Sequence, residues 1–456
     1  MRKWSPLVAV CLGTFLLLVD VTVVVVALPD IATSLGAGND DLQWVLDGYA
    51  LALAALLLGA GSLADRYGRR LTYLIGVLIF ALASLACAFA PSVGLLIAAR
   101  VVQGVGGAAM FATTAALLNV TYQGRDRGVA FGVWGAVNGA AAAAGPIAGG
   151  LLTEHLGWHW IFLVNLPVCA LAVWFTVRGV AESKAPWGGR FDVPGTVAFT
   201  VAAGAVVYGL ISASVDGWTA GSTLGAFVAG LAGFVVFIAV ERRSDHPMLD
   251  LGLFRRAPFS SLIVAAFLTQ AAAFAVMPYT TVWLQQILGH GPVDAGLLGA
   301  LPMSVASLLV GVLAGRALQR VPARWTVGMG LLLIAAGDLL QTRVSPSSGG
   351  DVLIPGLVVV GLGVGVVLPT MASAVLGEVP RERSGMAGGA LNAFRQLGFA
   401  FGVAVLGTVF GGVYTDGLDT ALRIAAGMAL LGSVVVLIFC KHTPVAERSV
   451  SAPAHA

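Results

Sequence analysis

Long apolar runs separated by short polar loops form the main pattern along the chain. A helix needs about 20 mainly apolar residues to cross the hydrocarbon core of a bilayer. Fourteen runs reach that length, and an even number of crossings places both termini on one side. The expected transmembrane helices are 7–28, 43–64, 71–90, 93–118, 129–152, 159–179, 193–214, 220–240, 258–284, 295–318, 325–343, 352–377, 386–413 and 420–440.

The charges in the loops support this division. Loops on the side of the N-terminus carry most of the arginines, for example Arg125 and Arg127 in one loop and Arg381 and Arg383 in another. The opposite loops are acidic: they carry Asp30, Asp40, Asp41, Glu154, Asp216, Asp294, Asp351, Asp416 and Asp419. Because short loops rich in Lys and Arg stay in the cytoplasm, both termini are predicted to be cytoplasmic.

Composition gives the same class of protein. Of the 456 residues, 58% are hydrophobic and only 10% are charged. Soluble domains carry about 25% charged residues, so this chain is expected to be solvated by lipid. No G-x-x-x-x-G-K-[ST] loop for ATP, no H-E-x-x-H motif and no metal-ligating Cys/His spacing occurs in the sequence. We therefore expect neither an enzyme nor a cofactor or bound metal.

An internal repeat indicates two related halves. The segment 61–70 aligns with 311–320 at a constant offset of 250 residues, and each links two spans on the predicted cytoplasmic side. Parallel halves with a site between them are typical of secondary transporters. The expected units are 1–180 (an N-terminal six-helix bundle), 181–257 (two linker helices with flanking loops), 258–441 (a C-terminal six-helix bundle) and 442–456 (a disordered cytoplasmic tail).

Several motifs resemble one family. Gly61-Ser-Leu-Ala-Asp-Arg-Tyr-Gly-Arg-Arg70 looks like the signature loop between spans two and three of the major facilitator superfamily. Segments 19–29, 100–106 and 139–150 resemble motifs of its fourteen-span drug:proton antiporter branch. The resemblance extends over about residues 8–440, with departures at His159, where the family usually has Arg, and at Gly315, in the place of Asp65 in the repeat.

The resemblance implies an all-α polytopic membrane protein with the major facilitator fold. That fold has two six-helix bundles, here joined by two central linker helices to give fourteen spans. It implies alternating access between two sides of the membrane and no cofactor.

Charged residues deep in the spans are the candidates for proton coupling. Asp20 in the first span and Arg100 in the fourth lie at similar depth, about 20 Å above one membrane face and about 12 Å below the other. Asp47 lies near the outer end of the second span. A carboxylate in hydrocarbon is costly and should face a cavity or a partner. The alternative is a structural Asp–Arg pair that holds helices together, and Asp47 has the further alternative of a position among the headgroups.

Polar residues within the spans of the second half are the candidates for substrate binding, together with Asp20 and Asp47. An ordinary polar contact between helices is the alternative for each of them. The second-half candidates are Gln270, Tyr279 and Gln285 in the ninth span, and Asn392, Arg395 and Gln396 in the thirteenth. Asn165, which precedes Leu166 and Pro167, is expected to stabilise a helix break.

Two segments are candidates for gating. The resemblance implies that Asp65, Arg66, Arg69 and Arg70 form a charge latch, whereas plain cytoplasmic topology also explains the arginines. In span five, Pro146 interrupts the hydrogen-bond ladder, and Gly145, Gly149 and Gly150 leave room for a close helix contact. Ordinary packing is the alternative for this second segment.

The function that follows is efflux of hydrophobic drugs or antibiotics in exchange for protons. We expect a monomer in the bacterial inner (plasma) membrane that binds protons, lipid and a cationic or neutral hydrophobic compound, and no nucleic acid. Arg100 and Arg395 leave amphipathic anions open as substrates. The alternatives are a proton-coupled symporter or metabolite exporter with the same fold, and a non-transporting membrane sensor.

Overall fold

The computed structural model describes residues 2–185, 191–245, 247–318, 321–344, 348–410 and 414–441, and within these ranges it contains helices and no strand. The tail 442–456 that was expected to be disordered lies outside the described residues. The helices are α1 (Ser5–Leu35), α2 (Asn39–Tyr67), α3 (Arg69–Ala88), α4 (Val93–Thr121), α5 (Gly124–Leu156), α6 (His159–Leu163), α7 (Asn165–Gly179), α8 (Val193–Val215), α9 (Gly221–Arg243), α10 (Ala257–Thr269), α11 (Met277–Val282), α12 (Pro292–Gly299), α13 (Leu301–Leu318), α14 (Ala323–Gln341), α15 (Ile354–Gly377), α16 (Ser384–Phe410) and α17 (Tyr414–Phe439).

The helices account for the predicted spans. In the described residues, twelve are long and apolar enough to cross a membrane, and two bent pairs bring the number to fourteen if each pair is one span. One bent pair is α5, whose parts Gly124–Ala141 and Ala144–Leu156 meet at 45°, and the other joins α12 to α13 at 48°. Pro146 lies just after the bend in α5, where its missing N–H weakens the backbone ladder.

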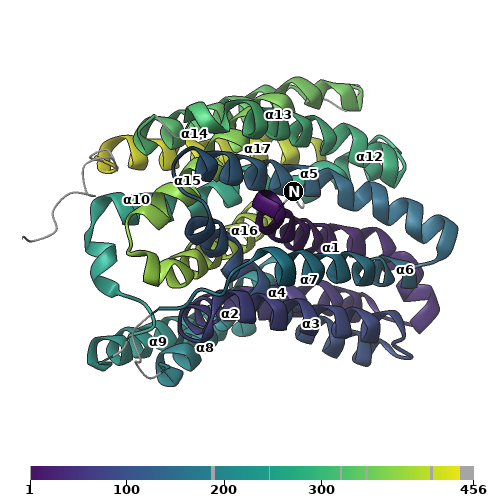
Figure 1. Cartoon of the computed structure of the whole chain (residues 1–456). Helices are drawn as coiled ribbons and strands as arrows, with labels where there is room; N and C mark the ends of the chain where they lie inside the picture. Colours follow the sequence, from purple (N-terminus) through teal and green to yellow (C-terminus); the bar gives the residue numbers. More distant parts are fainter. Residues whose placement is uncertain are drawn as a thin grey trace, which may run out of the picture.

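The helices form two bundles and a linker pair. Figure 1 shows α2, α3, α4 and α7 of the first bundle in the lower part of the view and α12, α13 and α14 of the second in the upper part, with α5 among the upper helices and α8 and α9 beside α2. The bundles meet where α2 packs on α16 and where α5 packs on α13. The linker pair packs its two helices together and rests on α2 and α16.

Glycine permits the closest approach between the bundles. A side-chain carbon at Gly61 in α2 would collide with the backbone of Gly385 in α16 and would lie 3.1 Å from the α-carbon of Gly389. Lipid provides no hydrophobic drive for helix association, so small residues that allow close backbone contact take its place. This explains why glycines recur inside the apolar runs.

The outward faces are apolar. On α8 and α9, large aliphatic side chains are more than half exposed, including Val197 and Val201 on α8 and Val228 and Leu231 on α9. Such a surface is stable only against hydrocarbon or another apolar surface.

The ninth predicted span is irregular. It runs from Ala257 to Ile287 and contains two π-helical turns, Gln270–Phe274 and Trp283–Ile287, on either side of α11. Single π-turns within helices are often found at functional sites. Three candidate residues, Gln270, Tyr279 and Gln285, lie in or between these turns.

Candidate functional site

Asp20 and Arg100 form an ion pair in the interior of the first bundle. Arg100 Nη1 lies 2.5 Å from Asp20 Oδ2, and both residues have no exposed surface. The guanidinium also donates to the carbonyl oxygen of Val45 at 3.0 Å and lies 4.4 Å from the centre of the Tyr49 ring. The sequence placed the two charges at similar depth, and the folded chain brings them into direct contact.

The second carboxylate oxygen of Asp20 is bound by two amides. Gln103 Nε2 donates to Asp20 Oδ1 at 2.9 Å, and Asn165 Nδ2 donates to the same oxygen at 3.1 Å. Both amides also donate to the Ser84 hydroxyl, at 2.9 and 3.2 Å. Helices α1, α3, α4 and α7 thus share one buried polar network around a single carboxylate.

Asn165 has a different contact from the one expected. A break does occur between α6 and α7, and Asn165 is the first residue of α7. Its side chain, however, points into the network and binds Asp20 and Ser84. No sequence pattern points to Ser84, a common small residue whose contacts come from two other helices.

Asp47 lies outside this network. It is half-buried on α2, and the side chain of Gln43, one turn earlier, donates a hydrogen bond to it. Two residues closer to the N-terminus, Val45 provides the carbonyl oxygen that binds Arg100. Asp47 therefore lies two residues along α2 from a backbone contact of Arg100, and it has no ion pair of its own among the described residues.

A second polar group lies between the bundles. Arg395 on α16 is 3% exposed and donates to Asn392 Oδ1 at 3.2 Å and, across the interface, to Asn138 Oδ1 on α5 at 3.4 Å. Its guanidinium lies 5.7 Å from the ring centre of Phe111 on α4, and Asn392 Nδ2 binds the Phe111 carbonyl oxygen at 3.0 Å. Asn138 was not among the sequence candidates.

The remaining substrate-binding candidates are more scattered. The Tyr279 hydroxyl donates to the Val403 carbonyl oxygen on α16. Gln270 is 8% exposed and its Oε1 lacks a hydrogen-bond partner, a cost that an added polar ligand would remove. Gln285 and Gln396 are half-buried. The structure brings Asn392 and Arg395 together and shows no direct contact among the other candidates within the described residues.

Asp65 and Arg69 join the two bundles at one end. Arg69 binds Asp65 Oδ1 through Nη2 at 2.6 Å and through Nε at 2.9 Å. The carboxylate accepts the backbone N–H groups of Gly385 and Met386 at 2.7 and 2.8 Å, so Asp65 caps the start of α16. Arg69 Nη2 also donates to the carbonyl oxygens of Arg381 and Glu382, each at 2.9 Å.

The neighbouring arginines behave differently. Arg70 donates to the carbonyl oxygen of Val177 at 3.1 Å, which keeps its contact within the first bundle. Arg66 stacks over Tyr67 with 5.2 Å to the ring centre and joins no described ion pair. Of the four gating candidates in this loop, Asp65 and Arg69 are the two that bridge the bundles.

Further hydrogen bonds close the same end. Asn119 Nδ2 on α4 donates to Ser384 Oγ at 2.8 Å, and Arg127 on α5 donates to the carbonyl oxygen of Ser373 on α15 at 2.9 Å. We name this set, Asp65, Arg69, Asn119, Arg127 and Ser384, the gate. The bundles are in contact along this end of the molecule.

The glycine-rich part of α5 faces two different helices. A side-chain carbon at Gly145 would collide with Thr22 of α1, and one at Gly149 would lie 3.0 Å from the Val23 carbonyl oxygen. Gly150 lies on the other side, where a side-chain carbon would meet Val293 Cγ2 at 3.1 Å, and Pro146 lies beside Gly296. This segment is packed between α1, which carries Asp20, and α12 of the second bundle.

The fold and these buried charges define a polytopic helical membrane protein with two bundles around a shared interface. A family model described as the Major Facilitator Superfamily matches residues 10–403 and 262–455. The chain belongs to the major facilitator superfamily. Its activity is accordingly of the transport class, and it is a multi-pass protein of the plasma membrane.

Relatives from bacteria extend over most of the chain. The chain is 39% identical over 404 residues to the multidrug resistance protein Stp of Mycobacterium tuberculosis. This match covers 88% of this chain and 75% of the relative. It is 34% identical over 420 residues to the tetracenomycin C resistance and export protein of Streptomyces glaucescens, with 91% and 78% covered. It is 35% identical over 462 residues to a puromycin resistance protein of Streptomyces alboniger, with 96% and 91% covered.

A solved structure shares the fold. The human organic anion transporter MFSD10 matches with a TM-score of 0.71 at 17% identity, and the match covers 96% of this chain and all of that one. At this identity the likeness concerns the arrangement of helices alone.

Proposed function

We propose that this protein exports hydrophobic drugs or antibiotics across the plasma membrane in exchange for protons, by alternating access. Three relatives named for drug resistance or export, each at 34% identity or more, support the efflux part of the proposal. The observation that carries the proton part is the buried Asp20–Arg100 pair, held by two amides and a hydroxyl.

The charge balance of this pair explains how a proton acts. With Asp20 ionised, the pair is neutral as a whole and its hydrogen bonds are satisfied. A proton that enters from outside and binds Asp20 cancels the negative charge and leaves the Arg100 guanidinium without its counter-ion. Because an unpaired buried charge is costly, the network rearranges, and this cost drives the conformational change.

Helix α1 transmits that change to the interface. Thr22 and Val23 follow Asp20 within one helical turn, and they pack on Gly145 and Gly149 of α5. Helix α5 in turn contacts α12 and α13 of the second bundle. A shift of α1 therefore alters the contact on which the two bundles rock, while the gate opens or closes at the Asp65 end.

The substrate is proposed to bind between the bundles. Asp47, Gln270, Tyr279, Gln285, Asn392, Arg395 and Gln396 are the residues that we assign to substrate contact, with Asp20 as the acid for which proton and substrate compete. Competition of this kind is reciprocal, so substrate binding releases a proton and protonation weakens substrate binding. A hydrophobic compound that is cationic or neutral fits such a scheme.

The direction of flux tests the proposal against the symporter alternative. Purified protein is reconstituted in liposomes and a pH gradient is imposed, with ethidium as the transported probe. An exchanger accumulates ethidium in the acidic compartment, because each proton leaves as the probe enters. Accumulation in the alkaline compartment, together with the protons, would instead identify a symporter.

A further inference from the structure

Two buried carboxyl groups lie where the linker pair begins and ends. Asp192 directly precedes α8 and is 7% exposed, and Glu241 lies in the last turn of α9 and is 4% exposed. A backbone N–H binds one oxygen of each: Gly195 donates to Asp192 Oδ1 at 2.7 Å, and Leu249 donates to Glu241 Oε2 at 3.3 Å. The other two oxygens, Asp192 Oδ2 and Glu241 Oε1, have no hydrogen-bond partner among the described residues.

These two unpartnered oxygens surround a single point. A side-chain carbon at Gly195 would lie 2.7 Å from Asp192 Oδ2 and 2.7 Å from Glu241 Oε1. Any larger residue at position 195 would therefore displace both oxygens. The glycine allows the two acids to approach each other beside the first turn of α8.

Two ionised carboxylates in this arrangement would repel each other, and each would keep an oxygen without a donor. Charged side chains around the pair are Arg242 and Arg243 on α9, Asp65 and Arg66 on α2, and Asp245 and Asp250 in the loop after α9. Neither Asp192 nor Glu241 forms an ion pair with any of the described arginines or lysines. A single proton removes one of the two charges and also supplies the missing donor.

We propose that Asp192 and Glu241 bind one proton between them, and that loss of this proton releases the loop that leads from α9 into the second bundle. With the proton on Glu241, the Oε1–H group donates to Asp192 Oδ2, and both carboxyl groups keep their backbone contacts. When the proton leaves to water, two negative charges face each other. Glu241 then turns away from Asp192, and its bond to the Leu249 N–H is lost.

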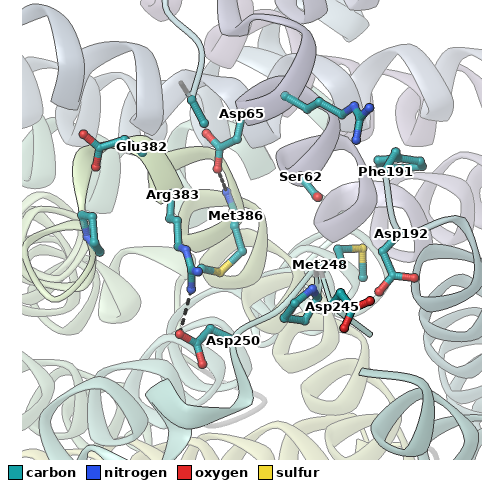
Figure 2. A pocket seen from close by; sticks show the side chains of 14 residues that line it. Ser62, Asp65, Phe191, Asp192, Asp245, Met248, Asp250, Glu382, Arg383 and Met386 are labelled. Carbon is teal, nitrogen blue, oxygen red and sulfur yellow. Dashed lines mark hydrogen bonds and ion pairs between the residues drawn. The ribbon is translucent and has the colours of Figure 1, made fainter. Parts of the chain in front are cut away.

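The loop joins this pair to the gate. Leu249, which Glu241 holds, is followed by Asp250, which binds Arg383 at 2.8 Å. Figure 2 shows this bond between Arg383 and Asp250. Arg383 in turn directly precedes Ser384 of the gate. The proton on the pair thus makes the contacts of the gate depend on the pH of the solution at this end of the molecule.

Single amide variants imitate the protonated pair. In Glu241→Gln, the amide nitrogen donates to Asp192 Oδ2 while the amide oxygen accepts the Leu249 N–H. In Asp192→Asn, the amide nitrogen donates to Glu241 Oε1, and Asn remains a good helix cap. The double variant Asp192→Asn/Glu241→Gln instead sets two donors against each other. Each single variant should therefore hold the loop and the double variant should release it, which is a non-additive result.

A nitroxide label in the loop measures this release. The label is attached to Asp245→Cys, an exposed position, in full-length protein that lacks the native cysteines and is embedded in lipid nanodiscs. At neutral pH the label should be as restricted in each single variant as in the labelled parent, and it should be more mobile in the double variant. Equal mobility in all four proteins, or an increase in each single variant that adds up in the double variant, would overturn the proposal.

The pH response distinguishes a bound proton from a bound metal ion. Between about pH 5 and about pH 9, the label in the parent should become reversibly more mobile as the pH rises, whereas both single variants should stay restricted. Glu154→Gln, which removes an exposed acid elsewhere on the chain, is the control and should keep the response of the parent. A parent that does not respond to pH, or single variants that still respond, would contradict the proposal. Restriction that requires added Mg²⁺ would assign the two oxygens to a metal ion and would also overturn it.

Infrared spectroscopy detects the shared proton itself. A protonated carboxyl group has a C=O stretch that is separate from the bands of a carboxylate. At neutral pH the parent should show one such band that is missing from Glu241→Gln and equally missing from Asp192→Asn, because the remaining acid is ionised in each. A band that survives in Asp192→Asn would show that Glu241 holds its proton alone, and the shared site would be refuted.

These outcomes are independent of the function proposed above. The label and the infrared band require neither a transported compound nor a pH gradient. If ethidium transport fails while the pair behaves as described, the export proposal falls and the proton site stands. If the reverse occurs, the proton site alone is lost.

Discussion

The cost of placing the Asp20 carboxylate inside the membrane is offset by groups from two other helices, α4 and α7. Arg100 supplies the opposite charge, and Gln103 and Asn165 supply two further donors. Removal of one partner from a buried ion pair leaves an uncompensated charge and costs about 3–5 kcal/mol, whereas loss of both charges costs far less.

Arg100→Gln is therefore predicted to lower the stability of the protein strongly. The thermal midpoint of detergent-purified Arg100→Gln should fall well below that of the wild type. Asp20→Asn/Arg100→Gln should recover most of the loss, because no buried charge remains. A single variant as stable as the wild type would show that water already compensates Asp20.

The residue scale also shows what the sequence can reveal about this site. Asp20 and Arg100 stand out because charges are rare in apolar runs, and equal depth predicts that they can meet. Ser84 and Asn138 do not stand out, since small polar residues are common in spans and their partners lie on other helices. The network forms only when the helices pack together, so the sequence of any one helix does not reveal it.

Among the elements, the junction between α2 and α3 has its contacts determined both by the charges of its residues and by their spacing. Asp65 is at the right position to cap α16, and Arg69, one turn later, holds it there while reaching the backbone of the second bundle. In the sequence repeat of the second half, Gly315 stands at the place of Asp65, so that copy of the motif lacks the acid.

The double variant Asp65→Asn/Arg69→Ala should reach the membrane at normal levels and transport more slowly. The reason is that the closed gate loses its ion pair and two backbone contacts at once. Initial rates of ethidium export from intact cells, normalised to protein level, provide the measurement. Arg66→Ala is the matched control, since Arg66 joins no described ion pair, and its rate should remain normal. A normal rate in the double variant would refute the latch.

A second prediction concerns the contact between the bent helix α5 and helix α1. Gly149→Val should cripple export, because its side chain would be forced against the backbone of Val23 on the helix that carries Asp20. Gly225→Val is the control: that position in α9 has open space around it, and export should persist. Efflux is measured by drug tolerance in a host without its own pumps. Equal efflux in both variants would show that the α1–α5 contact does not limit transport.

Helix positions were the most predictable part of the molecule. The predicted span 193–214 corresponds to α8 at Val193–Val215, and 352–377 ends where α15 ends. The predicted span 7–28 lies within α1, which continues through Pro29 to Leu35.

The π-helical turns could not be predicted. They fall at Gln270–Phe274 and Trp283–Ile287, inside a run whose apolar pattern is continuous. Gly398 and Gly402 on α16 closely approach the backbone of Phe267 and Ala271 beside the first turn, a contact between distant parts of the chain that the apolar pattern does not contain.

At the scale of the whole molecule, the two bundles are tied together at the Asp65 end. Hydrogen bonds there join α2, α3 and α4 to the start of α16 and the residues just before it. The structure thus represents a conformation in which the two bundles are in contact at this end. Which face of the membrane the gate occupies follows from the arginine distribution and is predicted to be the cytoplasmic one.

A cross-link should trap this conformation. In a variant whose native cysteines Cys11, Cys87, Cys169 and Cys440 are replaced, Asn119→Cys/Ser384→Cys places two thiols where the side chains now touch. Oxidation should stop export, and a reductant should restore it. Continued export by fully cross-linked protein would mean that the gate need not open.

In the proposed exchange, Asp20 gives up a proton when substrate binds. The most direct measurement is proton release from detergent-solubilised protein in weakly buffered solution on addition of ethidium, followed with a pH-sensitive dye. The wild type should acidify the medium in a saturable manner. Asp20→Asn, which keeps size and polarity but cannot titrate, should still bind ethidium and release no proton. Wild-type proton release by a folded Asp20→Asn protein would contradict the account and would transfer the role to Asp47.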